Sequence, residues 1–331
     1  HTRQAVDGCA RRVEDAQRKS SGAWRGCLRQ VACSDGLAVR RFYGVMMRNP
    51  YMIEGPTAIS FSGGRTSGYM LRRMLDANGG LPDCAKVLFA NTGKEMPETL
   101  DFVQECSERW GVPITWLEYR YADGKHTFAE VDWHTASRNG EPFAQVIKHR
   151  RMLPNPRVRF CTVELKVRTM HRYLKANGWT EWASVVGIRA DEPRRVAKLG
   201  NQDYGSHEER VAPLAADGVN AAQVGAFWAA SAFDLRLPNH GGKTMHGNCD
   251  LCFLKGGDQV LSLIREQPAL AVWWMQQEAY AADTFVERNL GGAFRFRLDR
   301  PSYAQMHNMA TAHGELFCFA DEAIEDCACT D

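Results

Sequence analysis

Short apolar runs alternate with longer amphipathic stretches over the first two thirds of the chain. A short apolar run bounded by turn residues predicts a buried strand, whereas an apolar position at every third or fourth residue predicts a helix. The runs typical of strands are residues 57–59, 86–90, 113–118 and 183–189. The stretches typical of helices are residues 67–75, 100–110 and 161–176. Strands that alternate with helices in this way predict an α/β fold with a parallel, helix-covered sheet.

The two ends of the chain have different patterns. Residues 1–45 are rich in Arg, Ser, Cys and Ala, which predicts an N-terminal extension that is disordered or not native. The candidates for a native start are Met46, Met47 and Met52. Residues 46–215 would then form the sheet domain and residues 216–331 a mainly helical C-terminal part. Within that part the pattern predicts a helix over 268–280 and an edge strand over 295–299.

A turn rich in serine and glycine joins the first predicted strand to its helix. Ser62 to Ser67 read Ser-Gly-Gly-Arg-Thr-Ser, which is neither a Walker loop nor a dinucleotide fingerprint. Backbone N–H groups and the helix dipole make such a helix start favourable for phosphate. Glycines allow close backbone approach, and hydroxyl groups can cap the helix or donate to phosphate. The candidate phosphate contacts are Ser60, Ser62, Gly63, Gly64, Arg65, Thr66 and Ser67.

Two other predicted strands end in polar residues that would meet the same edge of the sheet. Ligands of parallel sheets bind beyond the carboxyl ends of the strands. Guanidinium groups suit phosphate and sulfate oxygens. The candidates at these strand ends are Asn91, Thr92, Gly93, Gly187, Arg189 and Arg194. Residues 148–159 are rich in Lys and Arg, and they are interpreted as a cationic lid or as a flexible surface insertion. His126, His134 and His171 have no partner at a motif spacing and are interpreted as surface or core residues.

Charge and cysteine content narrow the function classes. The net charge of +2 does not call for a nucleic-acid partner, and no apolar run is long enough to span a membrane. Eleven cysteines without a secretory signal pattern predict a reducing, cytoplasmic setting and chemistry instead of disulfides.

Five cysteines are candidates for that chemistry. Cys249 and Cys252 form a Cys-x-x-Cys with glycines on both flanks, Cys161 opens a predicted helix, and Cys327 and Cys329 lie in the tail. One hypothesis is an iron–sulfur cluster held by Cys161, Cys249, Cys252 and Cys329. A second is a structural zinc ion on the same four thiolates. A third is a redox pair at Cys249 and Cys252 with a nucleophile in the tail.

Together these motifs resemble a known family. The loop is similar to the Ser-Gly-Gly-x-x-Ser loop of the PP-loop superfamily, whose fold is termed adenine nucleotide α-hydrolase-like. Asn91-Thr92-Gly93 and the segment from Gly187 to Arg195 resemble the corresponding segments of phosphoadenosine phosphosulfate (PAPS) reductases. Over residues 57–257 the chain is therefore similar to the PAPS reductase family, including its phage and bacterial branches.

The resemblance implies an oxidoreductase that binds PAPS, adenylyl sulfate or ATP. It implies that Arg189, Arg194 and Lys166 neutralise the sulfate, and that Cys329 or Cys327 attacks the sulfur. A thioredoxin-like reductant would release the product. The resemblance favours a 4Fe-4S cluster slightly over zinc. The chain departs from the family in having Phe160-Cys161 where cluster-type reductases have two cysteines, and in a tail without the Glu-Cys-Gly motif.

Two other functions stay open. The first is an ATP-dependent sulfurtransferase or ligase that releases pyrophosphate and modifies a nucleic-acid base. This enzyme would need Mg²⁺, for which Glu95 or Asp191 is a candidate ligand. The second is a nucleotide sensor without catalytic activity.

Overall fold

A computed structural model describes residues 49–199, 207–240, 243–244, 246–247, 249–285 and 294–312. The strands in these segments are β1 (Thr57–Ser60), β2 (Ala85–Asn91), β3 (Ile114–Ala122), β4 (Lys125–Val131), β5 (Trp182–Val185), β6 (Glu208–Val211), β7 (Asn239–His240) and β8 (Lys243–Thr244). The helices are α3 (Arg65–Asn78), α4 (Pro97–Trp110), α5 (Glu141–Arg150), the π-helix η1 (Thr162–Val167), α6 (Arg168–Ala176), α7 (Pro193–Lys198), α8 (Pro213–Ala216), α9 (Ala221–Ala229), α10 (Gly257–Glu266), α11 (Leu270–Thr284) and α12 (Tyr303–Thr311).

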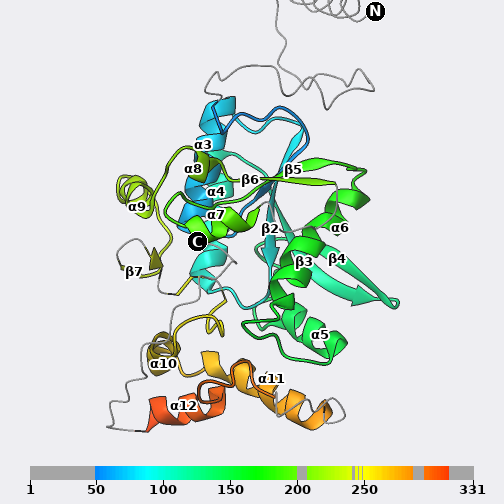
Figure 1. Ribbon diagram of the computed structural model, residues 1–331, viewed down its shortest axis with the longest axis vertical. Coiled ribbons are helices and arrows are strands. Elements are labelled where there is room, and N and C mark those ends of the chain that lie inside the picture. The colour runs from blue at the N-terminus through cyan, green and yellow to red at the C-terminus, as the bar shows by residue number, and fades with distance from the viewer. Residues whose placement is uncertain are drawn as a thin grey trace, which may run out of the picture.

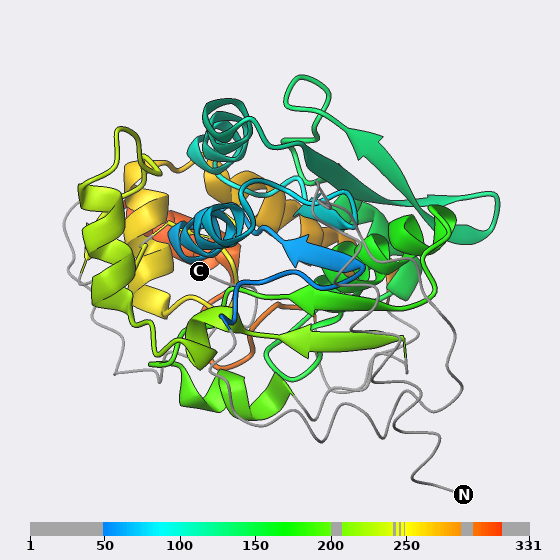
Figure 2. The same cartoon turned by 90° about the horizontal axis from the view of Figure 1, so that it is seen from above.

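The main sheet has the order β4-β3-β2-β1-β5-β6. Every neighbouring pair is parallel except β3 and β4, which are antiparallel. Figure 2 shows β1, in blue, in the middle of this twisted sheet. The arrangement confirms the predicted α/β fold with a mostly parallel, helix-covered sheet.

Successive side chains of the central strands point to opposite faces of the sheet. Ile59 and Phe89 belong to the core beneath α3 and α4, whereas Ala58 and Leu88 belong to a smaller core that includes Leu174 of α6. This alternation is expected because successive strand side chains point to opposite faces. Figure 1 shows α3 and α4 on one side of the sheet and α6 on the other.

The helices α10, α11 and α12 lie together at one end of the molecule, next to α5 (Figure 1). Their shared core centres on the fully buried Trp274, against which Phe296 and Tyr303 pack. The same core includes Phe143 of α5 and Leu165 of η1. The C-terminal helices are thus packed onto the segment that leads into α6.

Most predicted elements are confirmed, with three differences. The strands β4 and β6 were not predicted, because both are polar edge strands without a buried apolar run. The predicted fourth strand ends at Val185, four residues early. The edge strand predicted over 295–299 is wrong: the chain bends there, since the Phe296 N–H donates to Glu278 and Arg297 pairs with Asp299. No helix in the described segments is long and apolar enough to cross a membrane.

The whole of the predicted extension, residues 1–45, lies outside the described residues, as do Met46, Met47, Cys327 and Cys329. The division of the chain at residues 45 and 215 stays a prediction.

Candidate functional site

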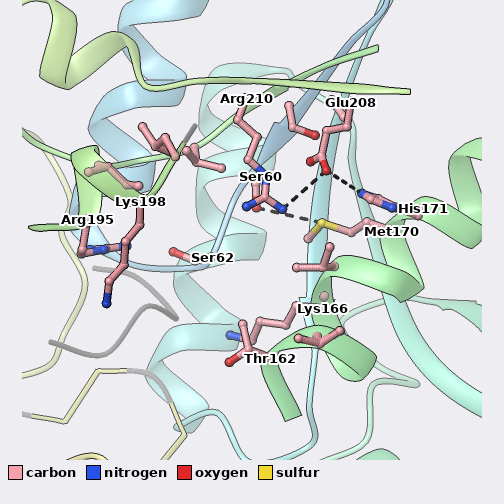
Figure 3. A pocket seen from close by; sticks show the side chains of 18 of the residues that line it. Ser60, Ser62, Thr162, Lys166, Met170, His171, Arg195, Lys198, Glu208 and Arg210 are labelled. Atoms are coloured by element: carbon pink, nitrogen blue, oxygen red, sulfur yellow. Dashed lines mark hydrogen bonds and ion pairs between the residues drawn. The ribbon is translucent and has the colours of Figure 1, made fainter. Parts of the chain in front are cut away.

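A cavity of about 570 Å³ lies between the sheet and the helical segment formed by η1 and α6 (Figure 3). Ser60 and Ser62 contribute to it from the end of β1, and Ala58 and Leu88 form part of its apolar floor. The helical wall consists of residues that recur on one side of the helix: Thr162, Val163, Lys166, Val167, Met170, His171 and Leu174. The first of these lie in a π-helical turn, a feature that is frequent at functional sites.

The glycine loop is held in a tight turn by its own serines. The Ser62 N–H donates to Ser67 Oγ at 3.2 Å, and the Ser67 hydroxyl donates to the Gly64 carbonyl at 2.9 Å. Gly63 has a φ of +79°, and a Cβ at this position would lie 2.6 Å from the Thr99 methyl group. Glycine is therefore required here both by the backbone conformation and by the lack of space. The turn leads directly into α3, whose N-terminus is the expected phosphate position.

A second glycine allows the end of β5 to approach this helix start. A Cβ on Gly187 would lie 3.3 Å from the Ser67 Cα and 3.4 Å from the Ser67 nitrogen. Since these are backbone atoms at the first turn of α3, a larger residue would have to push the loop away. Gly187 thus shapes the predicted site without contributing a side chain.

Two arginines expected to bind phosphate are turned away from the cavity. Arg65 forms a bidentate ion pair with Asp234, at 2.7 and 2.8 Å, and donates to the carbonyl groups of Leu235 and Leu237. Arg189 donates to Thr66 Oγ1 at 3.0 Å and pairs with Asp191 at 2.9 Å. Both side chains are buried and neither lines the cavity.

Other cations do line the cavity. Lys166 and Arg194 do so as expected, and the remaining basic side chains are Arg157, Arg159, Arg195, Lys198 and Arg210. Arg157 and Arg159 come from the segment interpreted as a lid, part of which, up to Arg150, belongs to α5. The cavity wall is thus predominantly positive, which favours an anionic ligand.

One end of the cavity carries a polar cluster that the sequence did not reveal. His171 Nε2 lies 3.2 Å from Glu208 Oε2, and Arg210 Nη2 lies 3.5 Å from the same oxygen. Burial by itself would raise the pKa of the Glu208 carboxyl, but hydrogen bonds from His171 and Ser184 and the charge of Arg210 lower that pKa to about 2. Glu208 is therefore ionised at neutral pH.

The loop after β2 lies against the Cys-x-x-Cys segment. Asp250 N–H donates to the Lys94 carbonyl at 2.7 Å, and Lys94 Nζ pairs with the Asp250 carboxylate at 2.6 Å. Thr92 Oγ1 is 3.5 Å from Cys249 Sγ, and Glu95 pairs with Cys249 in an isolated β-bridge. Both members of the Lys94–Asp250 pair are buried, so this junction fixes the position of Cys249.

Asn91 and Gly93 stabilise the turn itself and do not line the cavity. Asn91 Nδ2 donates to the buried Glu118 carboxylate at 2.6 Å, and the Gly93 N–H donates to Asn91 Oδ1 at 3.0 Å. Thr92 donates from its backbone N–H and its hydroxyl to Glu95 Oε2, at 2.9 and 2.8 Å. These contacts place the Glu95 carboxylate beside Lys166, whose Nζ is 3.9 Å from Glu95 Oε1.

The thiols near this junction form no disulfide. Cys161, Cys249 and Cys252 are free cysteines. Burial raises the pKa of the Cys249 thiol, and the Glu95 charge raises it further, against smaller opposing effects of Lys166 and Thr92. Cys161 is near enough to act on Cys249 electrostatically. Among the residues that the structure describes, no group of three or more His, Cys, Asp or Glu side chains could hold a metal ion.

Comparisons with known proteins place the chain in a family. Residues 56–217 match the model of the phosphoadenosine phosphosulfate reductase domain. The chain is 30% identical over 219 residues to the "Uncharacterized nin region protein ORF290" of Escherichia phage lambda. The alignment covers 64% of this chain and 70% of that protein. The chain belongs to the phosphoadenosine phosphosulfate reductase family. The phosphate complex of phosphoadenylyl-sulfate reductase from Candida auris is a further similar structure, at 19% identity and a TM-score of 0.35, covering 54% of this chain and 74% of that one.

Proposed function

We propose that the cavity binds an adenine nucleotide, namely PAPS, adenylyl sulfate or ATP, and that the protein carries out thiol chemistry on the sulfur of a bound sulfate ester. The phosphate would lie at the Ser62–Ser67 loop and the start of α3. The apolar floor at Ala58 and Leu88 suits a purine ring, and the basic wall suits the anionic end of the ligand.

The main support for this proposal is the position of Lys166. Its side chain lines the cavity, and its ammonium group lies 3.9 Å from the Glu95 carboxylate and acts on the Cys249 thiol. One residue therefore joins the nucleotide cavity to the cysteine segment. A phosphosulfate at the glycine loop would have its sulfur on the side of the cavity where the thiols lie.

The proposed reaction starts with attack of a cysteine thiolate on the sulfur of the phosphosulfate. A sulfur–sulfur bond forms and the bond between sulfur and the bridging oxygen breaks, so that the nucleotide leaves with the electron pair. A thioredoxin-like dithiol then reduces the enzyme thiosulfonate, which releases sulfite and leaves the dithiol oxidised. Lys166 and Arg194 would neutralise charge on the leaving phosphate.

The attacking thiolate is assigned to Cys329 or Cys327. Cys249 is less suited to this role, because burial raises the pKa of its thiol. Both tail cysteines lie outside the described residues.

A metal centre is proposed on Cys161, Cys249, Cys252 and Cys329, with an iron–sulfur cluster preferred to zinc. With Cys329 bound in this way, the attacking thiolate would be Cys327. The described thiols do not by themselves form such a centre, because no three of them are grouped so that they could hold a metal ion. Cys161 acts on Cys249 electrostatically, and the Cys252 N–H donates to the Cys249 carbonyl at 3.3 Å. A bound cluster would supply electrons or a polarising charge. Iron, sulfide and zinc analysis of anaerobically purified protein distinguishes the two.

The test compares Lys166→Met with Lys175→Met, which removes an exposed cation from the same helical segment outside the cavity. We expect Lys166→Met to lower the affinity for adenylyl sulfate about tenfold or more, because a charged hydrogen bond to phosphate is lost. Lys175→Met should change it less than about twofold. Equal effects of the two variants, or no binding by the native protein, would contradict the proposal. Sulfite release in the presence of a dithiol reductant then tests the chemistry.

A second candidate is the ATP-dependent sulfurtransferase or ligase acting on a nucleic-acid base. Its support is the buried Glu95 Oε1, which has no hydrogen-bond partner among the described residues and lies beside Lys166. Such an oxygen suits Mg²⁺ bound to a triphosphate. Magnesium-dependent release of pyrophosphate from ATP, without turnover of adenylyl sulfate, would favour this candidate.

A further inference from the structure

The cavity has two chemically different ends. Figure 3 shows Thr162 and Lys166 on one side of Ser60 and Met170, and Glu208, His171 and Arg210 on the other. The first end adjoins the glycine loop. The second lies deeper along the sheet, because Glu208 opens β6 and pairs in register with Trp182 at the start of β5. Ser184, which hydrogen-bonds the Glu208 carboxyl, is level with Ala58 in the sheet. From Ala58 to Ser62 an extended chain spans about 13 Å, a length that a nucleotide can cover.

The deep end is where the nucleoside of a bound nucleotide would lie. With the 5′-phosphate at the start of α3, the ribose and base extend along the apolar floor toward Glu208. Glu208 is the only acid among the described residues that line the cavity, and its side chain is only 7% exposed. The Arg210 charge at this end is paired with Glu208, whereas Lys198 and Arg195 lie on another side of the cavity (Figure 3).

A buried carboxylate accepts hydrogen bonds from hydroxyl and amino groups. At this end it also offsets the charge of Arg210, which would otherwise attract a phosphate. We propose that Glu208 makes the cavity select adenosine 5′-phosphates that carry no 3′-phosphate. Because this selection rests on the proposed nucleotide binding, it narrows the substrate to adenylyl sulfate or ATP and disfavours PAPS. His171 and Ser184 are positioning residues in this scheme, since they hold the carboxylate toward the ligand.

The experiment measures binding of 5′-AMP and of adenosine 3′,5′-bisphosphate to the full chain by isothermal titration calorimetry at one fixed ionic strength. We expect the native protein to bind 5′-AMP about tenfold more tightly or better. Glu208→Gln keeps the shape and an acceptor oxygen but removes the charge, so the preference should fall to about threefold or less through tighter binding of the bisphosphate. Glu209→Gln removes the same charge one residue further along, outside the cavity, and should keep the native preference.

Binding of the two nucleotides to the native protein already tests the proposed selection without any variant. Bisphosphate binding as tight as that of 5′-AMP would overturn the selection and leave the proposed nucleotide function standing. Binding of neither nucleotide would overturn both. An unchanged preference in Glu208→Gln would show that the selection does not depend on this carboxylate and would also overturn the assignment.

Discussion

The cavity has a loop wall, at the end of β1 and the Ser62–Ser67 loop, and the helical wall of η1 and α6. The two walls present different groups to a ligand. On the loop wall the side chains of Arg65, Ser67 and Arg189 are turned into the protein, and of residues 62–67 only Ser62 lines the cavity. On the helical wall Lys166 and His171 point into the cavity. The first wall offers a fixed shape, and the second offers chemically distinct groups.

This difference predicts two kinds of mutational effect. Changes on the loop wall disturb internal contacts and should act first on stability. Changes on the helical wall and at the deep end should act first on affinity and specificity.

The largest effect is expected for Arg65→Met. Loss of the guanidinium leaves the Asp234 carboxylate and the carbonyl groups of Leu235 and Leu237 without their donors. We expect the free energy of unfolding to fall by about 2–4 kcal/mol, measured by urea denaturation. Arg72→Met on the same helix removes a surface pair with Asp76 and a contact over the Trp110 ring, and it should cost less than about 1 kcal/mol.

Normal stability of Arg65→Met together with a tenfold loss of nucleotide affinity would contradict the expectation that changes on the loop wall act first on stability. That result would mean that Arg65 leaves Asp234 and contacts the ligand, as the sequence motif alone suggests.

Local features of the site could be predicted from the sequence, whereas long-range pairings could not. The glycine loop was predicted because strand, turn and helix follow one another within a few residues. The role of Arg65 could not be predicted, because its partner Asp234 is 169 positions away in the sequence. A side chain in a phosphate-loop motif has no local signal that distinguishes an internal ion pair from a ligand contact.

The deep end of the cavity was missed for the same reason. His171 has no partner at a motif spacing, and Glu208 lies in a short polar edge strand that has no apolar pattern. The two meet only because α6 covers the face of the sheet next to β5 and β6. One signal was available: His171 lies in the same predicted helix as the candidate Lys166, although a spacing of five residues does not by itself place the two side chains on one face.

An intermediate effect is expected for Gly63→Ala. This substitution combines a positive φ with a contact of 2.6 Å to the Thr99 methyl group, and we expect a loss of about 1–3 kcal/mol in unfolding free energy. Gly79→Ala is the matched control, because Gly79 has a similar φ of +67° but no atom within 4 Å of the added Cβ. The control should therefore lose less and keep its nucleotide affinity. Equal losses in the two variants would show that the crowding at Gly63 has no energetic consequence.

The smallest effect concerns the deep end and depends on pH. The pKa of Glu208 is about 2 in the folded protein, below its value of 4.5 in an unfolded chain, so its ionisation stabilises the fold above pH 4.5. That stabilisation is lost as the pH falls from 4.5 toward 2. We expect the difference in unfolding free energy between native protein and Glu208→Gln to shrink by about 1 kcal/mol between pH 7 and pH 4, measured by urea denaturation at both values. A difference that stays constant or widens over this interval would mean that the contacts of His171 and Ser184 do not favour the ionised carboxylate, and the deep end would then lack the fixed charge on which its selectivity depends.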